Sequence, residues 1–112
     1  MANVTQFGRS IGGYAAITAA TTQTQAAATP LTGGINFVSS ANANDAVLLP
    51  SGFAQGDSLI VVNSSAAALG VFPGTGGKIN NGTGDAVKAM AANMSGLFIS
   101  LGSNNWAAVL SA

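Results

Sequence analysis

Short apolar runs, each ended by turn-forming residues about every 8 to 12 positions, make up the chain from Leu31 to its end. This spacing is typical of β-sandwiches and β-barrels. Val, Ile and Phe gather in the runs, as they do in pleated, half-buried strands. The pattern predicts strands at residues 35–39, 46–49, 58–63, 69–72, 86–90, 96–101 and 106–111.

The residues between these runs explain why each strand stops. Gly, Pro, Asn and Asp tolerate a positive φ or pre-set a turn. Asn81-Gly82 is the strongest hairpin candidate, because a type I′ turn needs a positive φ at both central positions. We therefore predict an all-β fold, a small antiparallel β-sandwich or β-barrel of about seven to eight short strands with an extended N-terminal arm.

One predicted strand is apolar on both faces. Residues 58–63 have the sequence Ser-Leu-Ile-Val-Val-Asn. Apolar and polar residues do not alternate in it, as they do in a strand with one solvent-exposed face. A continuous apolar run marks a strand that is covered on both sides. We expect this strand to be the centre of a closed barrel, or its outer face to meet another subunit.

The first part of the chain differs in composition and has few large aliphatic residues. Its second half consists mainly of Ala, Thr and Gln, and the threonines argue against a helix there. We divide the chain into an N-terminal arm, residues 1–30, and a β-domain, residues 31–112. Candidate anchors of the arm on a neighbouring chain are Phe7, Ile11 and Tyr14. A frayed terminus is the alternative.

Charge is scarce along the whole chain. Three Lys or Arg and three Asp are the only charged residues among 112, and His and Cys are absent. An average soluble domain is about 25% charged. Three cations cannot form the basic stripe that a nucleic-acid binder needs. A neutral, charge-poor surface favours association, so we expect other chains to cover much of it.

The scarcity of charged residues and the absence of His and Cys also argue against catalysis and cofactors. Chemistry that depends on histidine or on a thiol is impossible, as are imidazole and thiolate metal sites. Nothing orders the three aspartates into an acid–base pair or a calcium site. The glycine-rich segment before Lys78 lacks the spacing of a phosphate-binding loop. We predict no enzyme activity, no catalytic residue, no metal and no cofactor. Because no apolar run reaches 18 residues, we predict no membrane partner either.

Trp106 is the only tryptophan of the chain. In a functional interpretation it stacks on a sugar or anchors a partner protein. In a structural interpretation it fills the core.

Several short motifs follow one another after the arm. They are Leu-Thr-Gly-Gly-Ile-Asn at 31–36, Asp-Ala-Val-Leu-Leu-Pro at 45–50, Gly-Asp-Ser-Leu-Ile-Val-Val-Asn at 56–63, Leu-Gly-Val-Phe-Pro at 69–73, Gly-Lys-Ile-Asn-Asn-Gly at 77–82, then Phe98 and Trp106. In this order they resemble a pattern found in small bacteriophage virion proteins, namely head decoration and fibre-like components. The resemblance implies a structural role in the virion and an all-β, trimeric module.

These observations together predict a capsid decoration (cement) protein on the capsid surface of a phage. Its expected partners are the major capsid protein and further copies of itself in a homotrimer, with residues 1–30 docking on neighbours and no nucleic acid or membrane involved. Such a protein stabilises the shell because it binds only the assembled state. One alternative is a tail fibre or baseplate attachment module. Another, of a different class, is a carbohydrate-binding module that uses Trp106.

Overall fold

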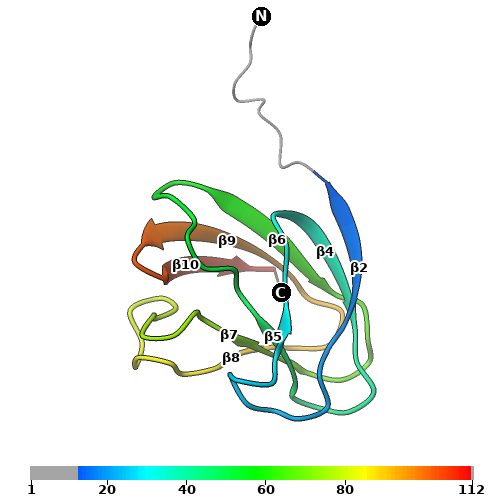
Figure 1. The fold of residues 1–112 in the computed structure, drawn as a ribbon. Helices are drawn as coiled ribbons and strands as arrows, with labels where there is room; N and C mark the ends of the chain where they lie inside the picture. The colour runs from blue at the N-terminus through cyan, green and yellow to red at the C-terminus, as the bar shows by residue number, and fades with distance from the viewer. Residues whose placement is uncertain (1–12, 112) are drawn as a thin grey trace, which may run out of the picture.

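The computed structural model describes residues 13–111, and this part of the chain forms strands and no helix (Figure 1). The strands are β2 (Tyr14–Thr18), β3 (Thr29–Pro30), β4 (Gly34–Ser39), β5 (Asp45–Leu48), β6 (Ser58–Asn63), β7 (Leu69–Phe72), β8 (Lys88–Met90), β9 (Ser95–Gly102) and β10 (Asn105–Leu110). The all-β prediction is confirmed. The seven strands predicted after residue 31 coincide with β4 to β10, within two residues at each end.

The strands form two mixed sheets. One has five strands in the order β10-β9-β6-β4-β2, and the other has four in the order β3-β5-β7-β8. In Figure 1 the five-stranded sheet lies above the four-stranded one. The arrangement is layered, and the two sheets do not close into a barrel. β6 is thus the middle strand of an open sheet.

The prediction of an antiparallel fold is wrong for four of the seven strand pairs. β2 with β4, β3 with β5, β4 with β6, and β5 with β7 all run parallel. The cause is that from β2 to β7 the chain changes sheet after every strand. Neighbours within a sheet are therefore two strands apart in sequence and point the same way. Only the β6–β9, β7–β8 and β9–β10 pairs are antiparallel.

Short backbone bridges connect the two edges of the five-stranded sheet to other parts of the fold. Ala20, just after β2, exchanges two hydrogen bonds of 2.9 Å with Ala46 in β5. On the opposite side, Trp106 of β10 donates to the Lys78 carbonyl at 2.8 Å and accepts from the Asn80 amide at 2.8 Å. The Asn80 side chain extends this contact by accepting from the Ala108 amide at 2.8 Å. The backbone groups on the outer edge of β10 are thus partly satisfied within the chain.

The core lies between the sheets and is built from both. Its buried apolar side chains include Val38, Leu59, Val61, Phe98 and Trp106 from the five-stranded sheet and Val47, Leu69, Val71 and Met90 from the four-stranded sheet. Two buried asparagines, Asn36 and Asn63, satisfy backbone groups beside this core. Burial of apolar area is the main stabilising term.

The expected boundary between arm and β-domain differs from the structure. Residues 14–18 form β2 at an edge of the five-stranded sheet, and Thr29–Pro30 forms β3 at an edge of the other. Ala19 and Ala28 are buried, and Ile17 packs against the core. Small residues suffice here because an edge strand gains most of its backbone hydrogen bonds from one neighbour. The rest of the expected arm, residues 1–12, lies outside the described residues.

The expected hairpin turn at Asn81-Gly82 is displaced by one residue and is not a strand-to-strand hairpin, because it lies within the long connection between β7 and β8. The central residues are Asn80 and Asn81, with φ values of 53° and 60°, and the Gly82 amide donates to the Ile79 carbonyl at 3.0 Å. A second turn with two positive φ values, at Ser103 and Asn104, joins β9 to β10. It forms the tight hairpin of the fold.

Candidate interaction surface

The five-stranded sheet carries a row of apolar side chains on its outer face, the surface directed away from the other sheet. Alternation of buried and more exposed residues along each strand assigns the outward positions. The strand register aligns five of them side by side across the sheet: Tyr14, Ile35, Ile60, Leu97 and Val109. We call these residues the apolar row.

Further outward residues extend the apolar row on both sides. Ala16, Phe37 and Val62 form an adjacent line across β2, β4 and β6. Ile99 and Ala107 are aligned on the other side, across β9 and β10. Cross-strand neighbours of this kind lie about 5 Å apart, so their side chains form one surface.

No charged residue occurs in any strand of the five-stranded sheet. The only charged residues within described strands are Asp45 and Lys88, both in the four-stranded sheet. Charged side chains normally prevent an exposed sheet from associating. This sheet lacks that protection, so its outer face is the strongest candidate for an interaction surface.

The two ends of the apolar row differ in shape. At the β2 end, Tyr14 is 67% exposed and Phe37 is 43% exposed, and their ring centroids are 6.4 Å apart. At the β10 end lies a shallow depression of about 300 Å³. It is lined by Ile60, Ser95, Gly96, Leu97, Val109, Leu110 and Ser111. One end therefore presents two aromatic rings while the other is hollowed.

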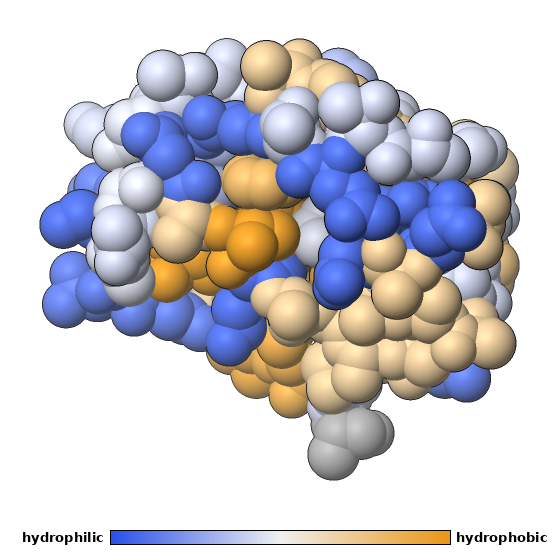
Figure 2. All heavy atoms as spheres, turned by 90° about the horizontal axis from the view of Figure 1, so that it is seen from below, coloured by the Kyte–Doolittle hydropathy of each residue, from blue (hydrophilic) through white to orange (hydrophobic). Residues whose placement is uncertain are grey.

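The outer face of the four-stranded sheet is covered by the protein's own loops. The Val87 side chain lies over Gly70 of β7, where an added Cβ would come within 3.0 Å of it. Gln25 donates to the Pro73 carbonyl at 2.8 Å and connects the two loops on this side. Figure 2 shows the molecule from this side, where an orange apolar area left of centre and a broader, pale-orange area at the lower right have blue hydrophilic residues between and around them. No described segment covers the apolar row in a comparable way.

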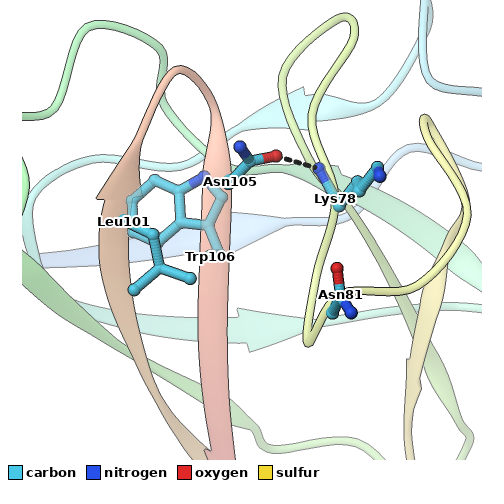
Figure 3. Close-up of a pocket in the computed structure, with 5 residues that line it drawn as sticks. All are labelled: Lys78, Asn81, Leu101, Asn105 and Trp106. Carbon is cyan, nitrogen blue, oxygen red and sulfur yellow. Dashed lines mark hydrogen bonds between the residues drawn. The ribbon is translucent and has the colours of Figure 1, made fainter.

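A second hollow, of about 210 Å³, lies beside the β9–β10 hairpin (Figure 3). Lys78 and Asn81 line one side of it, and Leu101, Asn105 and Trp106 line the other. The Asn105 side chain accepts a hydrogen bond from the Lys78 backbone amide at 3.1 Å. The lining contains no carboxylate, so it offers one amine and two carboxamides for polar contacts and no acid–base pair.

Trp106 belongs to the core. Only 1% of its surface is exposed, and its ring packs against Phe53 with centroids 5.6 Å apart. The buried Nε1–H has no hydrogen-bond partner among the described residues. The indole therefore has no free face on which a sugar could stack, and the structural interpretation of this residue agrees with its place in the fold.

The described aspartates act as acceptors for nearby donors. The buried Asp45 carboxylate accepts from the Ala41 and Asn42 amides, both at 3.0 Å. Hydrogen bonds from the Gln25 side chain and the Gly76 amide hold the pKa of Asp85 below its ordinary value of 3.8. Residues 13–111 contain no cluster of three or more potential metal-ligating His, Cys, Asp or Glu, and no helix able to span a membrane.

The three candidate anchors of the sequence analysis have different outcomes. Tyr14 lies on the outer face at the exposed end of the apolar row. Phe7 and Ile11 lie outside the described residues. Phe37, Leu97 and Val109 were not anticipated, because each belongs to a short run whose outward side is defined only by strand pairing. The doubly apolar run at 58–63 was the one sequence signal that pointed to this face.

Comparison of the chain with known protein families, with curated proteins and with solved structures finds no match.

Proposed function

We propose that this protein is a decoration protein of a bacteriophage capsid, which binds the assembled shell and stabilises it by bridging major capsid subunits. The observation that carries the proposal is the uncharged, exposed apolar face of the five-stranded sheet. An exposed apolar face of this kind marks a surface that other copies of the chain or other proteins cover, as in a component of a large assembly. The order of motifs that resembles small virion proteins supports the same function.

The proposed mechanism needs contact area rather than chemistry. A ligand that binds the assembled state and not the free subunits shifts the equilibrium towards assembly. Tight bidentate ion pairs are not required, which suits a chain with only six charged residues. Residues 14–18 and 29–30 of the predicted arm form strands β2 and β3, so the proposed capsid-docking segment is the preceding sequence, residues 1–12, with Phe7 and Ile11 as anchors.

Shells assembled with and without the protein test the proposal. We expect shells that carry it to survive higher temperature and stronger osmotic shock than bare shells. We also expect a Phe7→Ala/Ile11→Ala variant to bind shells more weakly while its thermal unfolding stays that of the wild type. If bare shells resist heat and osmotic shock equally well, the proposal is wrong.

Copy number separates the capsid from the tail. A decoration protein is expected in numbers comparable with the major capsid subunits, counted by imaging of whole particles. A few copies confined to the tail would instead support an attachment module.

A further inference from the structure

We infer that the apolar row is the surface through which two copies of this chain join, with the Tyr14 end of one copy packed into the depression at the Val109 end of the other. This inference deepens the proposed function, because it names the contact that builds the oligomer. It concerns the isolated protein and can be tested without a shell.

The first argument is the absence of charge on this face. None of the five strands contains a charged residue, so a partner gains nothing from carrying charges opposite it. A basic or acidic partner would instead lose hydration of its charges without compensation. A second copy presents an equally neutral face and avoids this loss.

The second argument is the complementary shape of the two ends. Tyr14, 67% exposed, and Phe37, 43% exposed, present two aromatic rings at the β2 end. The depression of about 300 Å³ lies at the other end, lined in part by Ile60, Leu97 and Val109. Aromatic side chains in apolar pockets are the contacts that most often dominate interfaces. The chain therefore carries both halves of one contact on one face.

Symmetry allows this contact to be satisfied in every copy. If a two-fold axis runs parallel to the central strand β6 and between the two facing sheets, β2 of each copy faces β10 of its partner. Both Tyr14 ends then meet a Val109 end in the same dimer. Around a three-fold axis, each copy gives its Tyr14 end to one neighbour and its depression to the other. Both arrangements use the same residues.

The size of the face suits a stable but modest interface. Five strands about 4.8 Å apart, with about six residues rising about 3.3 Å each, give a projected area of roughly 500 Å². This is below the about 800 Å² that each partner contributes to a standard interface. Interfaces below the standard size belong to the weak, transient class, so we expect self-association at about micromolar protein concentration and not a permanent oligomer.

Thiol cross-linking tests the contact directly, because the natural chain contains no cysteine. Separately prepared Tyr14→Cys and Val109→Cys variants are mixed and treated with a short bis-maleimide, and we expect a covalent dimer that contains one copy of each variant. Sheets packed face to face lie about 10 Å apart, and a disulfide needs Cα atoms within about 7 Å, so the reagent spans a gap that a direct disulfide would not. The control mixture pairs Tyr14→Cys with Val87→Cys, which lies on the loop that covers the other sheet and is 51% exposed. It should give no more than background.

Sedimentation velocity of the full chain provides the second measurement. We expect wild-type dimers or trimers at micromolar concentration, and Val109→Asp should weaken association at least about tenfold because it places an unpaired carboxylate in the contact. Val87→Asp is the matched control, and it should associate like the wild type. Both sites are more than half exposed, at 63% and 51%, so both variants are expected to fold.

Three outcomes would overturn the inference: a monomeric wild type over this range, equal weakening by the two aspartate variants, or cross-linking of the control pair as efficient as that of the test pair. These results would leave the shell experiment unaffected. Conversely, shells that gain nothing from the protein would refute the decoration function without affecting the self-contact.

Discussion

The side-chain amide of Gln25 donates a hydrogen bond of 3.0 Å to the carboxylate of Asp85, sixty positions further along the chain. The same amide donates to the Pro73 carbonyl at 2.8 Å, and Asp85 also accepts from the Gly76 amide at 2.6 Å. Gln25 thus connects the loop after β2 to the loop before β8. These loops cover the side of the four-stranded sheet that faces away from the core.

The pKa of Asp85 should depend on Gln25. The hydrogen bond from Gln25 is the larger cause of its lowering, and the Gly76 amide is the next. A lowered pKa means that folding favours the carboxylate, so this stabilisation is complete above the ordinary value of 3.8 and is lost as the pH falls through the folded-state pKa. We expect Gln25→Ala to raise the pKa of Asp85 in a carbon-13 NMR titration of its carboxyl group. Gln23→Ala, which removes a neighbouring glutamine, should not; an unchanged titration in the Gln25 variant would contradict the assignment.

Asn63 should be among the most sensitive polar residues. Its buried amide donates to the carbonyls of Ala67, Met90 and Ala91 at 2.9, 3.2 and 3.1 Å, and its oxygen accepts from the Ser65 amide at 3.1 Å. Asn63→Ala removes these four hydrogen bonds, one of them to the carbonyl of the buried Met90, and we expect a loss of about 2–4 kcal/mol in the free energy of unfolding. Urea denaturation measures it. The exposed Asn42→Ala is the comparison and should cost less than about 0.5 kcal/mol.

Gly77 is required for the close approach of two loops. A Cβ built at this position would overlap the carbonyl oxygen of Asn104 in the β9–β10 turn. We expect Gly77→Ala to cost about 2–4 kcal/mol or to prevent folding, since one backbone must move away from the other. Gly84→Ala, in the same loop, meets no atom within 4 Å and should keep the wild-type urea midpoint. Similar midpoints for the two variants would show that the loops do not pack in this way.

Trp106 should contribute to stability through its volume and not through its N–H group. Trp106→Ala removes a side chain that is 1% exposed and packed against Phe53, with an expected cost of about 3–5 kcal/mol. Trp106→Phe retains a ring, and its lost Nε1–H has no partner among the described residues, so about 1–2 kcal/mol is expected. Thermal unfolding followed by circular dichroism compares the two. If the two variants lose equal stability, the Nε1–H group contributes to the stability of the fold and this prediction is wrong.

The sequence located individual strands well because their signal is local. Residues 58–63 and 69–72 were predicted at their observed boundaries, where apolar runs meet Asn, Pro and Gly. β2 was missed because it leads into a stretch rich in Ala, Thr and Gln and contains no run of apolar residues, although Tyr14, Ile17 and Thr18 favour a strand. The parallel or antiparallel direction of the strand pairs could not be predicted either, because an apolar run does not indicate which strand lies beside it.

The candidate surface was only partly predictable for a related reason. Alternation within a strand tells which residues share a face, but the order of strands in the sheet decides which faces adjoin. Tyr14 and Val109 come from opposite ends of the described chain and share the apolar row only through the strands between them. The doubly apolar β6 showed that its second face would be covered, without showing by what.

The position of β6 between β4 and β9 also determines when the five-stranded sheet can be completed during synthesis. One ladder of β6 joins β4, which precedes it in the chain, and the other joins β9, which begins only at Ser95. A nascent chain emerges from its N-terminus, so the apolar β6 has an unpaired edge until the C-terminal hairpin has left the ribosome. Contacts between strands distant in sequence form slowly, whereas the β9–β10 hairpin is local. Arrival of this hairpin is therefore the step that protects the growing chain from aggregation.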